Sequence, residues 1–214
     1  MVYEMIDAMP DNPIELVKAY VASGIFPGAS FAIVNGSDVQ KHVYGYNRLK
    51  PEPVLLQADM AYDLASVSKV VGTGTLMINL ILSGKVGLDD LLTTQYPEFE
   101  GSGGASLTIR QLLTHTSGID PFIKNRNTLP YDALRAALNQ VTVTADKTFH
   151  YTDVNFILLG FMLETIYAQD LADILQEQVF TPFKMIHTGF TALDRTVATA
   201  WDLPQGLVHD PKAQ

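Results

Sequence analysis

A serine and a lysine stand three residues apart in Ser66-Val-Ser-Lys69, where the chain enters an apolar stretch. On a helix, residues i and i+3 share a face, so the Lys69 amine can reach the Ser66 hydroxyl. A lysine partly stripped of water can be neutral and accept the proton that a serine must lose to become a nucleophile. Backbone N–H groups at a helix start are unpaired and can stabilise an oxyanion. The spacing therefore favours acyl chemistry at Ser66.

This tetrapeptide is a weak signal by itself, because about 0.4 Ser-x-x-Lys matches are expected by chance in a chain of this composition. The alternative interpretation is that Ser66 only caps a helix. A second feature, Tyr151-Thr-Asp153, opens a later apolar segment, and about one such match is expected by chance. Its alternative is a packed tyrosine followed by Asp153 as an N-cap.

Sequence patterns predict the elements that position these residues. Asn12-Pro13 is typical of a helix start and predicts a helix over 13–23. Alternating segments 29–34 and 39–46 flank Asn35-Gly36, which predicts a β-hairpin. Residues 47–60 contain two prolines and are predicted to form a loop.

The rest of the chain is predicted to be mostly helical, without a comparable set of later strands. The helix over 66–83 is so apolar that we expect it to be central and buried around most of its circumference. We therefore predict an α+β fold, with residues 1–60 forming a helix plus hairpin and residues 61–214 a helical lobe. The other predicted helices are a short one with a capping box at Thr108–Gln111, and those over 131–140, 153–168 and 170–179.

Composition excludes several classes of protein. The 214 residues are 47% hydrophobic and 17% charged, which excludes a disordered chain. A net charge of −9 without a Lys/Arg cluster argues against nucleic acid as a partner. The longest apolar stretches fall short of the roughly 20 residues of a membrane span. No export signal is visible, so we expect a cytoplasmic protein, or an extracytoplasmic one if a leader was removed.

Cofactors are not expected either. The chain has no cysteine, and no two histidines have the i, i+4 spacing of a helical metal site. We therefore predict neither a metal nor a cofactor.

Three segments occur in order at wide separations: Asp63-Leu-Ala-Ser-Val-Ser-Lys69, Leu112-Leu-Thr-His-Thr-Ser-Gly118 and Phe149-His-Tyr-Thr-Asp-Val-Asn-Phe-Ile-Leu-Leu-Gly160. Together they resemble the serine β-lactamases and penicillin-binding proteins, especially the class C-like branch that includes cytoplasmic esterases. The resemblance extends from about Phe26 to Ala213 and includes Pro182–Met185 and Val208–Ala213.

The resemblance implies an acyl-enzyme mechanism on a small ester, an amide or a β-lactam. Ser66 would attack the carbonyl, Lys69 would accept or share its proton, and Tyr151 would relay that proton to the leaving group. The Ser66 backbone N–H would form half of an oxyanion hole. Asp153 stands where the family often has Asn, whose amide would help to hold Lys69 and the substrate. An acid at this substrate-binding position departs from that pattern and would strengthen the charged form of Lys69, which leaves the state of the base open.

The histidines also allow a triad interpretation. For His115 the family segment favours a structural turn, and His150 is a candidate substrate-side contact; His42 and His209 are the others considered. The literal His187-Thr-Gly189 resembles the family's third motif, but its flanks match a loop that precedes the strand carrying that motif. We expect it to be unrelated to catalysis.

Relatives continue past the segment resembling Val208–Ala213 into a helix and three further strands that complete the sheet. We therefore expect an incomplete sheet here, with an unpaired edge and exposed apolar faces. This predicts a homo-oligomer, an exchanged segment or pairing with a separate C-terminal chain. It also leaves two functions open: an active serine hydrolase, or a weakly active or non-catalytic subunit.

Overall fold

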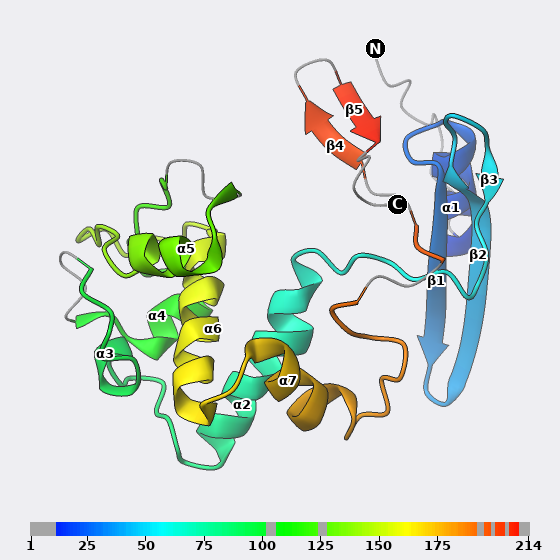
Figure 1. The fold of residues 1–214 in the computed structure, drawn as a ribbon. Helices are drawn as coiled ribbons and strands as arrows, with labels where there is room; N and C mark the ends of the chain where they lie inside the picture. Colours follow the sequence, from blue (N-terminus) through cyan, green and yellow to red (C-terminus); the bar gives the residue numbers. More distant parts are fainter. Residues whose placement is uncertain are drawn as a thin grey trace. The chain divides into compact units, whose positions relative to one another are not determined.

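The computed structural model describes residues 12–101, 106–123, 128–191 and 195–197, and the backbone of 200–203 and 206–209. Of the family-like segment Val208–Ala213, everything beyond residue 209 lies outside the described residues. The chain forms two compact units (Figure 1). We call residues 1–63 with 191–214 the N-terminal unit, and residues 64–190 the helical unit.

The N-terminal unit begins with helix α1, Pro13–Ala22, as the Asn-Pro pair predicts. The Asn12 side chain accepts a hydrogen bond from the Ile14 N–H at 2.9 Å, which satisfies one unpaired donor of the first turn. None of the α1 residues is buried. Residues 16–21 are half-buried, so partial packing and the cap together stabilise this helix.

The predicted hairpin is confirmed by strands β1, Gly28–Asn35, and β2, Asp38–Arg48, which pair antiparallel. Gly36 has a φ of +59°, the conformation that makes Asn-Gly favourable in a tight hairpin turn. The loop predicted over 47–60 is wrong in part. Strand β2 continues to Arg48, and β3, Val54–Leu55, adds a third antiparallel strand beyond an irregularity in register.

A second hairpin pairs β4, Ala200–Leu203, with β5, Gly206–His209. The prediction that no comparable strands follow the first hairpin is therefore wrong in this segment. The two strands have four residues each, too short for an alternating pattern to stand out from the sequence. The α+β fold class itself is confirmed.

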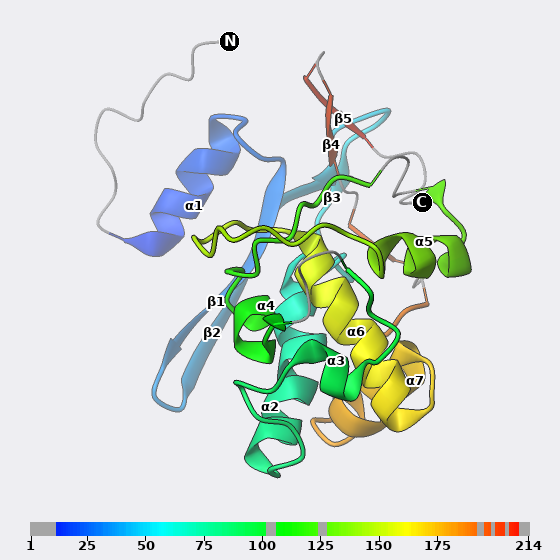
Figure 2. The ribbon, with the colours of Figure 1, turned by 90° about the vertical axis from the view of Figure 1, so that its left-hand side faces the viewer.

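The helical unit contains the remaining elements (Figure 2). Residues 67–82 are helical throughout, and part of this stretch has the wider π-helical turn. No helix in the described part of the chain is long and apolar enough to cross a membrane. The elements are the π-helical η1 (Lys69–Gly74), then α2 (Thr75–Leu82), α3 (Leu92–Gln95), α4 (Ile109–Leu113), α5 (Tyr131–Leu138), α6 (Asp153–Tyr167), α7 (Leu171–Leu175) and the π-helical η4 (Gln176–Phe180).

Helix α6, rather than the helix over 66–83, is the centre of this unit. It contacts α3, α4, α5, α7 and η1, and it is buried almost continuously from Val154 to Leu163. By contrast, Val70, Ile78 and Leu82 are 71%, 56% and 81% exposed. The prediction of burial around the 66–83 helix is thus wrong, because helices of this unit cover only the side that carries Leu76 and its neighbours.

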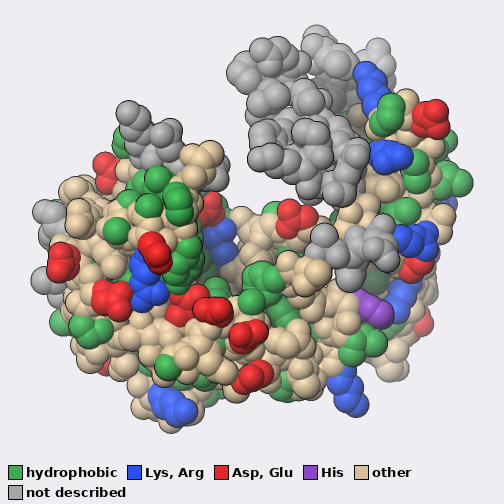
Figure 3. All heavy atoms as spheres, viewed as in Figure 1, with side chains coloured by type: hydrophobic (Ala, Val, Ile, Leu, Met, Phe, Trp, Pro, Cys, Tyr) green, Lys and Arg blue, Asp and Glu red, His purple; other side chains and the backbone are tan. Residues whose placement is uncertain are grey.

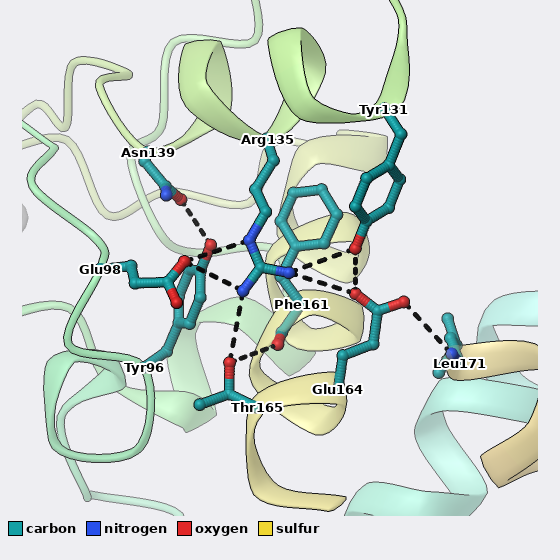
Figure 4. A network of polar contacts seen from close by, with 9 residues as sticks. All are labelled: Tyr96, Glu98, Tyr131, Arg135, Asn139, Phe161, Glu164, Thr165 and Leu171. Carbon is teal, nitrogen blue, oxygen red and sulfur yellow. Dashed lines mark hydrogen bonds and ion pairs between the residues drawn. The ribbon is translucent and has the colours of Figure 1, made fainter. Parts of the chain in front are cut away.

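A polar network joins α5 to the later turns of α6 (Figure 4). The Arg135 guanidinium lies 5.2 Å from the ring centroid of Tyr96 and 5.0 Å from that of Phe161. It also forms ion pairs with Glu98 at 3.0 Å and Glu164 at 3.4 Å. Arg135 therefore fills a gap between helices with both charge and packing surface.

Candidate active site

Ser66 lies immediately before the first helical residue of the helical unit. The preceding Ala65 has a φ of +43°, so the chain bends sharply before it enters the helix. Successive turn hydrogen bonds then lead into the helix, from the Val67 N–H to the Leu64 carbonyl at 2.8 Å through to the Lys69 N–H to the Ser66 carbonyl at 3.2 Å. The bend leaves Ser66 exposed at a helix N-terminus, where the sequence placed it.

Two side chains, one from each of two distant segments, contact the Ser66 hydroxyl, and a third contacts Lys69. Lys69 Nζ donates to Ser66 Oγ at 3.0 Å, and Tyr151 Oη donates to the same oxygen at 2.7 Å. Lys69 Nζ also forms an ion pair with Asp153 Oδ1 at 2.7 Å. The structure thus brings together all four site residues named from the sequence.

Lys69 keeps its proton in this arrangement. Burial lowers the pKa of Lys69, but hydrogen bonds and charge interactions with Asp153 and Tyr151 outweigh burial and leave the pKa above its ordinary 10.5. At neutral pH the side chain is therefore an ammonium. Asp153 compensates for the water that Lys69 has lost and favours the charged form, as an acid at this position is expected to do.

The pKa of Tyr151 shifts in the opposite direction to that of Lys69. Hydrogen bonds with Lys69 and then Ser66 lower the pKa of its phenol below the ordinary value of 10. The ring is 49% exposed, and Lys69 Nζ lies 5.3 Å from its centroid. The neighbours of Tyr151 therefore favour its deprotonated form.

Thr152, between Tyr151 and Asp153, fixes where helix α6 begins and so orients both side chains. Thr152 is the N-cap of α6, and its Oγ1 accepts from the Val154 N–H at 3.2 Å. The sequence placed the cap at Asp153, which is wrong by one residue, because Thr152 is the last residue with extended backbone. Asp153 is thereby the first helical residue, and its carboxylate is available to Lys69.

The histidines occupy different positions. The buried His115 contacts the Tyr151 ring, with centroids 4.6 Å apart. His150 is exposed beside Tyr151, and His42 lies in β2. The side chain of His209 lies outside the described residues. Within the described helical unit, His187-Thr-Gly189 lies in turns after η4 rather than on a strand.

Sequence reasoning missed two buried polar residues beside the site. Asn155 is fully buried, and its Oδ1 accepts from Ser117 Oγ at 2.7 Å. Its Nδ2 lies 3.1 Å from Nδ1 of His115. The available signal was an asparagine inside the apolar run that starts at residue 154, a position where a buried amide needs partners.

A sequence profile of the Beta-lactamase family matches residues 14–214. The chain belongs to the Beta-lactamase family. Among curated relatives, it is 27% identical to Protein flp of Staphylococcus aureus (strain MW2), covering 82% of this chain and 37% of that protein. It is 28% identical to a Putative D-alanyl-D-alanine carboxypeptidase of Salmonella agona (strain SL483), covering 70% and 38%. The chain thus spans well under half the length of these relatives.

Solved structures share the fold. A class C beta-lactamase has a TM-score of 0.77 at 19% identity, covering 92% of this chain and 55% of the other. EstCE1, described as a hydrolase with promiscuous acyltransferase activity, has a TM-score of 0.76 at 22% identity, covering 92% and 57%. FmtA from Staphylococcus aureus has a TM-score of 0.76 at 20% identity, covering 91% and 56%.

Proposed function

We propose that this chain is a serine hydrolase of the β-lactamase and esterase type, acting on small esters or amides through an acyl-enzyme at Ser66. The observation that carries the proposal is the convergence of Lys69 and Tyr151 on one serine oxygen at a helix N-terminus. Nucleophilic catalysis requires this combination of a hydroxyl, a base within hydrogen-bond reach and a group that orients the base.

Acylation begins with Tyr151 as phenolate, stabilised by the Lys69 ammonium. The phenolate takes the Ser66 proton, and Oγ attacks the substrate carbonyl carbon while the carbonyl electron pair moves to its oxygen. The Ser66 backbone N–H at the helix start is a donor for this oxyanion. Tyr151 then gives its proton to the leaving alcohol or amine as the bond to the acyl carbon breaks.

Deacylation reverses these roles with water. Tyr151, again a phenolate, takes a proton from a water molecule that attacks the acyl carbon, and the Ser66 oxygen leaves with that proton. Asp153 keeps Lys69 charged through both steps and lies where it can contact the bound substrate. A β-lactam fits the same steps, with the ring nitrogen as the leaving group.

A second candidate is a weakly active subunit that needs further strands from another copy or a separate segment. Exposed apolar side chains in the N-terminal unit favour it: Val34 and Val39 of the hairpin are 67% and 50% exposed. Figure 3 shows hydrophobic side chains at the surface over the strands of this unit. Such edges and faces promote association. Light scattering after size-exclusion chromatography distinguishes a monomer from a self-associated form.

Activity is tested with an activated ester, a chromogenic cephalosporin and a fluorophosphonate, recording turnover and intact mass. We expect a covalent adduct on Ser66, and its loss with all turnover in Ser66→Ala. Ser83→Ala, at the far end of the same helix, is the matched control and should retain activity. Turnover that survives Ser66→Ala contradicts the nucleophile assignment, whereas an acyl burst without turnover favours the weakly active subunit.

A further inference from the structure

His115 contacts three consecutive residues of the segment that carries the candidate base. Its backbone carbonyl accepts from the His150 N–H at 2.8 Å. Its Nδ1 accepts from the Thr152 N–H at 3.4 Å. Between these two contacts, its ring lies against the ring of Tyr151, with centroids 4.6 Å apart and planes 39° apart. His115 thus contacts the residue before Tyr151, the residue after it and the Tyr151 ring itself.

The hydrogen bonds of His115 define which nitrogen carries the proton. A backbone N–H can only donate, so Nδ1 of His115 is the acceptor and the proton of the neutral ring is on Nε2. The Asn155 amide agrees with this tautomer. Its Oδ1 already accepts from Ser117, so its Nδ2 is the group that faces His115 Nδ1 at 3.1 Å.

Hydrogen bonds from residues 144–147 hold the turn that contains His115. His115 itself has a φ of +56°, a backbone conformation that few side chains adopt without local support. Lys147 Nζ donates to the Ser117 carbonyl at 2.6 Å, and the Thr144 N–H donates to the Gly118 carbonyl at 2.8 Å. A side chain at Gly118 would lie 2.4 Å from the Asp146 carbonyl oxygen, so only glycine permits this close packing.

We propose that His115 is a positioning residue that holds the Tyr151 ring within reach of Ser66 and Lys69. The effect of His115 on the rate of hydrolysis rests on the proposed function. Its effect on the position of Tyr151 holds whether or not the chain is a hydrolase. Burial and the nearby Lys69 charge lower the pKa of His115, while Asp153 opposes them, so the imidazole is neutral and Nδ1 stays an acceptor at neutral pH. Displacement of a reacting group by about 1 Å can cost on the order of a hundredfold in rate.

Two substitutions separate the contacts of His115. His115→Phe keeps an aromatic ring but loses the acceptor for the Thr152 N–H. His115→Asn keeps an acceptor and tolerates positive φ but loses the ring. The matched control is His42→Phe in β2, where the imidazole also stacks on an aromatic ring, with centroids 5.0 Å apart.

Two readouts follow the position of Tyr151. The near-ultraviolet difference titration between each protein and its Tyr151→Phe counterpart reports the ionisation of Tyr151 alone. In His115→Phe we expect this pKa to rise toward the ordinary value of 10, since the ring moves away from Lys69 and Ser66. The kcat for an activated ester should fall by about ten- to a hundredfold with little change in KM. His42→Phe should change neither quantity.

Unchanged Tyr151 titration and kcat in folded His115→Phe would overturn the proposal. A measurement on the unmodified protein covers the case in which the variants do not fold. The nitrogen chemical shifts of His115 should show an unprotonated Nδ1 and a protonated Nε2 at neutral pH, and a protonated Nδ1 would equally overturn the proposal. If the unmodified protein neither turns over an ester nor labels at Ser66, the proposed function fails, while the titration and the nitrogen shifts still test the placement.

Discussion

Each end of helix α6 carries a cluster of a carboxylate, a cation and a tyrosine, but the two clusters shift the pKa of the tyrosine in opposite directions. At its start, Asp153 joins Lys69 and Tyr151; near its end, Glu164 joins Arg135 and Tyr131. Each cluster contains a carboxylate, a cation and a tyrosine. Yet the pKa of Tyr151 is lowered, whereas that of Tyr131 is raised.

Both phenolic oxygens contact a cation, since Arg135 Nη1 donates to Tyr131 Oη at 3.2 Å, and the difference lies in the carboxylate that also contacts Tyr131. Tyr151 lies beside an ammonium and a hydroxyl, both of which stabilise a phenolate. The pKa of Tyr131 is raised first by burial and then by its hydrogen bond to Glu164, because an ionised phenol would face a second anion. A carboxylate, a cation and a tyrosine therefore favour a phenolate or a neutral phenol according to whether the carboxylate itself contacts the phenolic oxygen.

The sharpest test of this comparison removes one hydroxyl from each cluster. Tyr151→Phe should lower kcat for an activated ester by about a hundred- to ten-thousandfold, the usual contribution of general base catalysis. Tyr131→Phe should leave kcat unchanged and only lower the urea midpoint of unfolding. Steady-state kinetics and urea titration of both variants measure these effects. Equal rate losses in the two variants would remove the distinction between the clusters.

Removing the cation from each cluster should separate stability from activity. Arg135→Met leaves Glu164, whose side chain is only 15% exposed, without its guanidinium and should cost about 2 kcal/mol of the free energy of unfolding. Lys69→Met should cost less, because the Asp153 side chain is 41% exposed and remains hydrated, but should abolish turnover. Lys85→Met is the control for loss of a charge elsewhere. A fully active Lys69→Met contradicts the assigned role of the ammonium.

A third prediction concerns the pH dependence of kcat/KM. Activity requires Tyr151 deprotonated and Lys69 protonated, so it should rise through a pKa below 10 and fall through one above 10.5. Asp153 raises the pKa of both groups. Asp153→Asn should therefore move both limbs of the profile to lower pH. A profile whose alkaline limb stays in place would show that Asp153 does not hold the Lys69 proton.

The smallest expected effect lies in the structural cluster. The buried Tyr96 donates to Asn139 Oδ1 at 2.8 Å, and burial raises the pKa of its phenol. Tyr96→Phe should cost about 1 kcal/mol of stability, the usual net value of one hydrogen bond, with kcat unchanged. Urea unfolding and steady-state kinetics measure the two quantities. A lower kcat in Tyr96→Phe would contradict this prediction, because it would show that the structural cluster influences the candidate site at the other end of α6.

Local signals in the sequence were sufficient for several elements. Asn12-Pro13 predicts the start of α1, and Asn35-Gly36 predicts the turn between β1 and β2. Both signals act within a few residues, through backbone conformation and hydrogen bonding. Two of the three family-like segments likewise contain the four side chains that come together at the candidate site.

Features that depend on distant contacts were not predictable in the same way. The protonation of Lys69 follows from a distance of 2.7 Å to Asp153, which lies 84 positions further along the chain. The contacts of His115 with residues 150–152 require the turn at His115 to pack against the start of α6. A sequence names such residues as candidates, but only the packing of the segments fixes which atoms face each other.

The π-helical turn between Lys69 and Gly74 has a further consequence. Here the Thr75 N–H bonds to the Val70 carbonyl five positions earlier, so this turn holds one residue more than an α-helix would. The wide turn accommodates this extra residue while keeping the α-helical turns on either side in phase, so deleting one residue from 70–74 would let the segment relax to regular α-helix with the serine and lysine on nearly the same face relative to Leu76 and Met77. A one-codon deletion in this turn would therefore leave the hydrophobic interior and the nucleophile in phase, whereas a deletion in the regular helix that follows would rotate the later residues by about 100° relative to Ser66.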